Sequence, residues 1–167
     1  VDRLLLNDGS GRFAEPPDGS PFAHPGLGMS TSWADWDEDG DLDAYATNYL
    51  CVGCDFLGST DVDRASDVLW QTGDDGSMTD RRDLIADPQL LAGAGFQAAW
   101  FDADDDGDLD LLIVNDRGND DDVRPGDFLR RNVFLRNDGP GCGGRCFVEA
   151  AKEWGLDSRL DSMGVAV

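Results

Sequence analysis

Residues 28–48 read GMSTSWADWDEDGDLDAYATN, and residues 95–115 read GFQAAWFDADDDGDLDLLIVN. The two stretches align without a gap at a displacement of 67 residues, so that Trp33 recurs as Trp100. A fixed period of this length is typical of proteins built from repeated units that pack on their neighbours. The sequence therefore predicts a tandem repeat.

The remainder of the unit also recurs. LLLNDGSGRFAE at 4–15 is echoed by FLRNDG at 134–139 and CFVEA at 146–150, and a degraded version, VLWQTGDDGSMTD, lies at 68–80. The predicted organisation is the end of one unit at 1–27, full units at 28–94 and 95–161, and the start of a further unit at 162–167.

Within each unit, short apolar runs bounded by Gly, Asp and Asn indicate β-strands, because no long segment keeps a helical period. Asn7-Asp8-Gly9 and Asn137-Asp138-Gly139 are each expected to reverse the chain between the last two strands, and helical turns are expected at 83–92 and 150–155. The predicted strands are 29–34, 42–48, 67–72 and 77–82, then 96–101, 109–115, 132–137 and 146–150. Four-stranded units at a fixed period predict an all-β fold of β-propeller blades.

The motif DxDxDGDLD occurs twice, at 35–43 and at 102–110, and we name these segments loop 1 and loop 2. Side chains at positions 1, 3, 5 and 9 converge only if the backbone wraps around a point, which the glycine at position 6 permits. Carboxylates about 4 Å apart repel by about 4 kcal/mol at an effective dielectric constant near 20, so the wrapped loop needs a cation. Oxygen ligands with loose geometry favour Ca²⁺ over Mg²⁺, zinc or copper.

We therefore predict two Ca²⁺ sites, one in each full unit. Each takes four side-chain carboxylates and the backbone carbonyl at position 7, whereas Glu38 and Asp105 at even positions are expected to face solvent. The predicted ligands are Asp35, Asp37, Asp39, Asp41 and Asp43 in loop 1, and Asp102, Asp104, Asp106, Asp108 and Asp110 in loop 2.

An EF-hand loop also begins DxDxDG, but it requires a bidentate glutamate at position 12. Ala46 and Ile113 hold that position here, and the sequences that follow the acidic residues read as buried strands instead of helices. Loops 1 and 2 are therefore predicted to be β-hairpin connections.

The charge and composition exclude several functional classes. The 35 acidic residues against 13 basic ones give a formal net charge of -22, which repels nucleic acid and anionic membranes. No apolar stretch approaches the roughly 20 residues of a membrane helix. With only His24 and Lys152 as histidine and lysine, no convincing catalytic triad, three-histidine zinc site or Schiff base can be assembled, and we expect no enzymatic activity.

The four cysteines fall into two local pairs, Cys51 with Cys54 and Cys142 with Cys146. Two small disulfide-closed loops in an oxidising compartment are the favoured interpretation. A zinc site shared by both pairs and a redox-active CxxC are the alternatives.

These motifs resemble the FG-GAP/VCBS repeat family, and in particular the bacterial relatives of cartilage acidic protein, which often carry an ASPIC/UnbV region. The resemblance spans nearly the whole chain apart from the insertions at 49–66 and 139–146. It implies Ca²⁺-binding blades of a propeller with roughly seven blades, an extracellular, periplasmic or cell-surface location, and the ligands named above. Because ring closure takes at least four blades, the two full units predict a fragment of a longer propeller.

The expected function is non-catalytic binding or adhesion to a protein or glycan at the cell surface, or to the segments that complete the propeller. One alternative is a structural subunit of a surface complex or filament, which would dock through exposed sheet edges. Another is a calcium-dependent enzyme that acts on polysaccharide.

Overall fold

The computed structural model describes residues 3–17, 19–20, 22, 27–49, 66–116, 131–140, 145–158 and 162–167. In these residues the protein is all-β, with ten strands in antiparallel sheets, two 3₁₀ helices and one short α-helix. No helix in the described part of the chain is long and apolar enough to cross a membrane.

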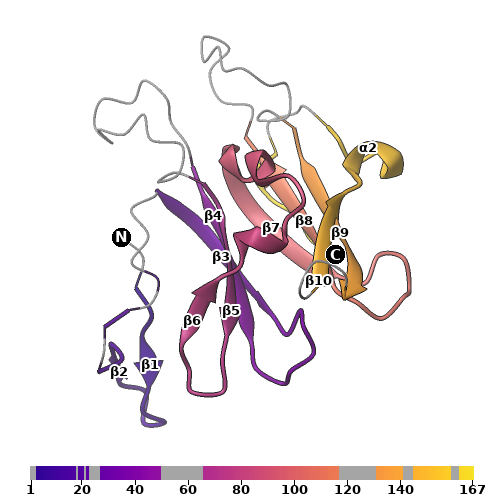
Figure 1. Ribbon diagram of the computed structural model, residues 1–167. Helices are drawn as coiled ribbons and strands as arrows, with labels where there is room; N and C mark the ends of the chain where they lie inside the picture. Colours follow the sequence, from indigo (N-terminus) through magenta and orange to yellow (C-terminus); the bar gives the residue numbers. More distant parts are fainter. Residues whose placement is uncertain are drawn as a thin grey trace.

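The first full unit forms a four-stranded sheet in which neighbours along the chain are neighbours in space, in the order β3-β4-β5-β6 (Figure 1). Its strands are β3 (Gly28–Ala34), β4 (Asp43–Asn48), β5 (Val68–Thr72) and β6 (Met78–Asp80). All three pairings are antiparallel. β4 is buried along its whole length, as its central place in the sheet requires.

The second full unit repeats this arrangement, with the sheet order β7-β8-β9-β10. Its strands are β7 (Gly95–Phe101), β8 (Asp110–Asn115), β9 (Val133–Pro140) and β10 (Arg145–Glu149). β7 and β8 begin and end 67 residues after β3 and β4, so the period predicted from the sequence is present in the structure. Each predicted strand lies within three residues of the observed bounds.

Short elements frame the two sheets. β1 (Leu6–Asn7) and β2 (Phe13–Ala14) form a separate two-stranded hairpin at the N-terminal side. The 3₁₀ helices η1 (Arg82–Leu84) and η2 (Pro88–Ala92) connect the two units, and α2 (Ala151–Trp154) follows β10. The helical turns expected at 83–92 and 150–155 are therefore confirmed.

The main hydrophobic core lies between the two sheets and beneath η1 and η2. β8 shows why a short run of four apolar residues belongs in a strand: Leu111 and Ile113 point into this core, whereas Leu112 packs against a second cluster around Phe134. The side chains that form the main core are Trp36, Tyr45, Leu69, Leu84, Ile85, Leu90, Leu91, Ala98, Leu111, Ile113, Val133, Leu135 and Phe147.

The two units are also joined by polar contacts along β3 and β7. The Trp100 indole nitrogen donates to the Ser32 carbonyl oxygen at 3.4 Å, and the Thr47 hydroxyl donates to the Phe96 carbonyl at 3.4 Å. On the other side of the interface, the Ala86 amide donates to the Phe147 carbonyl of β10 at 3.0 Å. One face of each sheet is therefore covered by the neighbouring unit.

One predicted reversal is wrong. Asn7-Asp8-Gly9 does open the β1–β2 hairpin, with Gly9 at φ 83°. Asn137-Asp138-Gly139, in contrast, lies inside β9, which runs on to Pro140. Gly139 has φ 75° and coincides with a register shift between β9 and β10, so the left-handed residue serves a β-bulge here and not a turn.

Candidate metal centres

Loop 1 connects β3 to β4, and its first aspartate organises the turn. Asp35 Oδ1 accepts the Asp39 amide at 3.1 Å, and Asp35 Oδ2 accepts the Gly40 amide at 3.1 Å. The Asp41 amide donates to Asp39 Oδ1 at 2.9 Å. These bonds curl the backbone around its own carboxylates, as the motif predicted.

Loop 2 connects β7 to β8 and repeats each of these bonds. Asp102 accepts the amides of Asp106 and Gly107, both at 3.1 Å, and the Asp108 amide donates to Asp106 Oδ1 at 2.9 Å. The same motif therefore adopts the same hydrogen-bonding pattern in both units.

The wrap requires left-handed backbone at two positions in each loop. Gly40 and Gly107 have φ 100° and 93°, a region that glycine enters without a steric penalty. Glu38 and Asp105 have φ 61° and 60°, which is uncommon for residues with a Cβ atom. Both are exposed, in agreement with the predicted solvent-facing positions. Strain of this kind persists where the surrounding structure holds it in place.

The carboxylates at positions 1, 3 and 5 converge in both loops. Carboxylate oxygens of Asp35, Asp37 and Asp39 lie within 4.8 Å of one another, and the same holds for Asp102, Asp104 and Asp106. Ca²⁺–oxygen distances of about 2.5 Å place ligands on opposite sides of the ion about 5 Å apart. Each group is therefore compact enough to surround one ion of this size.

The aspartate at position 9 of loop 1 lies at the start of β4 and is fully buried. Asp43 Oδ1 accepts the Thr72 amide at 2.8 Å, whereas Oδ2 is buried and accepts no hydrogen bond of normal geometry. Burial, assisted by repulsion from Asp37 and Asp39 and opposed by the backbone amides of Thr72 and Trp36, raises the pKa of Asp43 to about 7. A buried oxygen without a hydrogen bond of normal geometry, next to two further carboxylates, is suited to a cation.

Its counterpart in loop 2 is held differently. Asp110 is also fully buried, but Oδ1 accepts the Asn137 amide at 2.8 Å and Oδ2 accepts the Ala103 amide at 2.9 Å. Burial is again the main cause that raises the pKa of Asp110, with repulsion from Asp104 and Asp106 as smaller contributions. Asp110 therefore lies near the three converging carboxylates of loop 2, and both of its oxygens already accept a backbone hydrogen bond.

The donor set of each site consists of oxygen alone. Neither group contains a histidine or cysteine, so the ligand types match a hard cation such as Ca²⁺ and not zinc or copper. The structure brings positions 1, 3 and 5 together and places position 9 beside them. The backbone carbonyls predicted as ligands at Asp41 and Asp108 stay a prediction.

The other predicted site concerns the cysteines. Cys146 lies in β10 and is buried. Cys51, Cys54 and Cys142 lie outside the described residues, as does most of the insertion at 49–66, so both pairings remain predictions.

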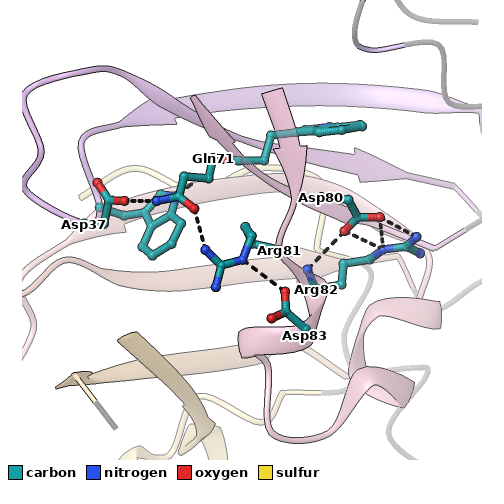
Figure 2. Close-up of polar contacts among 8 residues, drawn as sticks. Asp37, Gln71, Asp80, Arg81, Arg82 and Asp83 are labelled. Carbon is teal, nitrogen blue, oxygen red and sulfur yellow. Dashed lines mark hydrogen bonds and ion pairs between the residues drawn. The ribbon is translucent and has the colours of Figure 1, made fainter. Parts of the chain in front are cut away.

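Sequence reasoning missed a chain of side chains that supports loop 1. Gln71 of β5 donates its amide nitrogen to Asp37 Oδ2, and its amide oxygen accepts a hydrogen bond from Arg81 (Figure 2). Arg81 also pairs with Asp83 in η1, Nε to Oδ1 at 3.1 Å. Gln71 and Arg81 are far from loop 1 in sequence, and the pairing of β4 with β5 brings Gln71 close to it.

It also missed a residue that contacts both loops. Asn137 is fully buried, and its backbone amide donates a hydrogen bond to Asp110 of loop 2. Its side-chain nitrogen reaches the Trp36 carbonyl of loop 1 and the Leu109 carbonyl of loop 2, both at 3.4 Å. The repeated NDG triplet marked this position in the sequence, but as a turn.

Comparison with models of known protein families gives no match to this chain. A comparison with curated proteins likewise finds none that is significantly similar.

Proposed function

We propose that the chain is a calcium-binding, non-catalytic module of an extracellular FG-GAP/VCBS-type propeller that binds a protein or a glycan. The observation that carries the proposal is the double occurrence of one loop geometry, with three converging carboxylates and the same three backbone bonds in each copy. Unneutralised, each group would repel itself by several kcal/mol, and a divalent cation removes that repulsion. Calcium at extracellular, millimolar concentration fills even weak sites.

The arrangement of the two sheets supports a propeller. Each unit is a four-stranded antiparallel meander, and the first strand of one unit lies beside the first strand of the next. At the C-terminal end, the Val165 amide donates to Gln97 Oε1 of β7 at 3.2 Å, which is where the first strand of a further unit belongs. We infer that other segments complete the ring.

Calcium titration of the full chain against a competing chelator tests the metal assignment. We expect two ions per chain, and one ion after Asp39→Ala or Asp106→Ala. Asp74→Asn is the matched control, because it removes one exposed carboxylate in the β5–β6 turn and should leave both ions bound. A chain that is folded and binds no ion at millimolar calcium would refute the proposal.

Assembly through open sheet surfaces is a second candidate function, favoured by the apolar side chains exposed on the first unit. Met29 and Trp33 of β3 are 38% and 43% exposed, and Leu27 beside them is 37% exposed. Light scattering in the presence of calcium tests this candidate, because a strictly monomeric folded chain would argue against it. Turnover on a panel of polysaccharides, abolished by a chelator, would instead support the enzyme alternative.

A further inference from the structure

The strand registers show which residues correspond behind the two loops. Trp70 of β5 pairs with Ala44 of β4, and Leu135 of β9 pairs with Leu111 of β8, the equivalent of Ala44. The next residues along β5 and β9 are Gln71 and Arg136, so these two occupy the same structural position. The residues after them confirm the match, because the amides of Thr72 and Asn137 each donate at 2.8 Å to the position 9 aspartate.

Behind loop 1 this position carries a neutral donor. The Gln71 amide nitrogen bonds Asp37 Oδ2, and Arg81 holds the amide oxygen, so the orientation of the amide is fixed (Figure 2). Arg81 is itself fixed by Asp83. A ligand carboxylate that is oriented by a neutral hydrogen bond keeps its full negative charge for a cation.

Behind loop 2 the same position carries a positive charge. The Arg136 guanidinium pairs with Asp138, Nε to Oδ1 at 2.5 Å and Nη2 to Oδ2 at 3.2 Å. Asp138 is the main cause that raises the pKa of Arg136, and Glu153 and Asp104 of loop 2 contribute at longer range. A positive charge on the strand behind a metal site opposes the binding of a cation there.

The position 9 aspartates differ in the same direction. Asp43 has one buried oxygen beside loop 1 that accepts no hydrogen bond of normal geometry. Both oxygens of Asp110 already accept backbone amides. The Trp36 amide, the equivalent of the Ala103 amide, also approaches Asp43, so the two aspartates differ in the geometry of this hydrogen bond and not in the donors around them.

We propose that the two loops form calcium sites of unequal affinity, with loop 1 the tighter, and that Gln71 and Arg136 set the difference. Gln71 acts as a positioning residue for Asp37, whereas Arg136 weakens the site that contains Asp104. The inference rests on the proposed calcium-binding function and adds the order in which the sites fill. At rising calcium concentration, loop 1 is occupied first.

The test measures each site alone in the full chain. Asp106→Ala leaves only loop 1 and Asp39→Ala leaves only loop 2, and calcium affinity is read by chelator competition. We expect loop 1 to bind about tenfold more tightly, since supporting residues around a metal typically change affinity by about 10- to 100-fold. Gln71→Arg should then weaken loop 1 about tenfold, and Arg136→Gln should strengthen loop 2 about three- to tenfold.

Matched controls make the same changes of residue away from the loops. Gln89→Arg adds the same charge at an exposed position in η2, and Arg12→Gln removes one at an exposed position beside β2. Neither should alter either affinity by more than about twofold, because exposed charges beyond a Debye length of about 8 Å are screened. Circular dichroism verifies that each variant is folded.

Equal affinities for the two isolated loops, a tighter loop 2, or exchanged residues that leave both affinities unchanged would overturn the inference. If Gln71→Arg does not fold, Arg136→Gln decides alone, because glutamine already occupies this strand position in the first unit. Absence of binding at both loops would instead refute the calcium-binding function itself, so the two failures are distinguishable.

Discussion

Replacing Asp67 with asparagine should stabilise the protein at neutral pH. Asp67 precedes β5 and is 1% exposed; its Oδ1 accepts the Asn48 amide at 2.7 Å, and its Oδ2 accepts the Tyr45 hydroxyl at 2.9 Å. In the second unit, the equivalent residue is Asn132, whose Oδ1 accepts the Asn115 amide at 3.1 Å. The repeat itself therefore shows that asparagine makes the same backbone contact.

The magnitude follows from the cost of burying the charge. Burial raises the pKa of Asp67 from 3.8 to about 7, because the two hydrogen bonds only partly replace water. The folded-state pKa lies above the unfolded one, so the stability associated with the protonated acid is complete below about pH 4 and is lost as pH rises through 7. A pKa difference of about three corresponds to about 4 kcal/mol.

Asp67→Asn removes this penalty and keeps the shape of the protonated acid. We expect the variant to unfold at the same urea concentration as wild type near pH 4 and to be more stable by about 2 to 4 kcal/mol at pH 8. Other carboxylates also titrate over this range, so the quantity to follow is the difference between variant and wild type at each pH, at constant calcium.

Asp74→Asn serves as the control, since it removes an exposed carboxylate and should change the free energy of unfolding by less than about 0.5 kcal/mol at either pH. An Asp67→Asn variant that is less stable than wild type at pH 8 would refute the reasoning. A difference that does not grow between pH 4 and pH 8 would do so as well.

Further changes test the packing and the metal. Gly95→Ala should cost about 1 to 3 kcal/mol in thermal unfolding, because the new Cβ atom would lie 2.7 Å from Asp67 Oδ1; Gly164→Ala meets its nearest neighbour at 3.5 Å and should cost little. Trp36→Ala should cost about 3 to 5 kcal/mol in urea unfolding, since the ring is 1% exposed, whereas Trp33→Ala, at 43% exposure, should cost clearly less. Chelation of calcium should lower the melting temperature more than reduction of the cysteines does, because each predicted disulfide closes only a very short loop; the reverse order in calorimetry would contradict the calcium assignment.

Much of the fold could be predicted because its signals are local. β8 is an example: the bounded apolar run after DGDLD predicts a strand at 109–115, and the observed strand is Asp110–Asn115. The acidic loops were equally predictable, since Asp35 and Asp102 bond amides only four and five residues away. A conformation that a segment determines by itself can be deduced from that segment.

The features that could not be predicted depend on pairing between distant strands. The triplet NDG turns the chain at Asn7, but at Asn137 the partner strand β10 continues and the same residues form a bulge. The bond between Gln71 and Asp37 exists only because β5 pairs with β4, across an insertion whose sequence gives no register. The spacing of residues within a segment does not tell which other strand will pair with it.

The side-chain amide of Asn137 constrains the lengths of both loops in any redesign of this chain. Because one side chain reaches a carbonyl in each of two successive loops, an insertion or deletion in either loop would displace an atom that the other depends on. The lengths of loop 1 and loop 2 are therefore coupled through this one side chain.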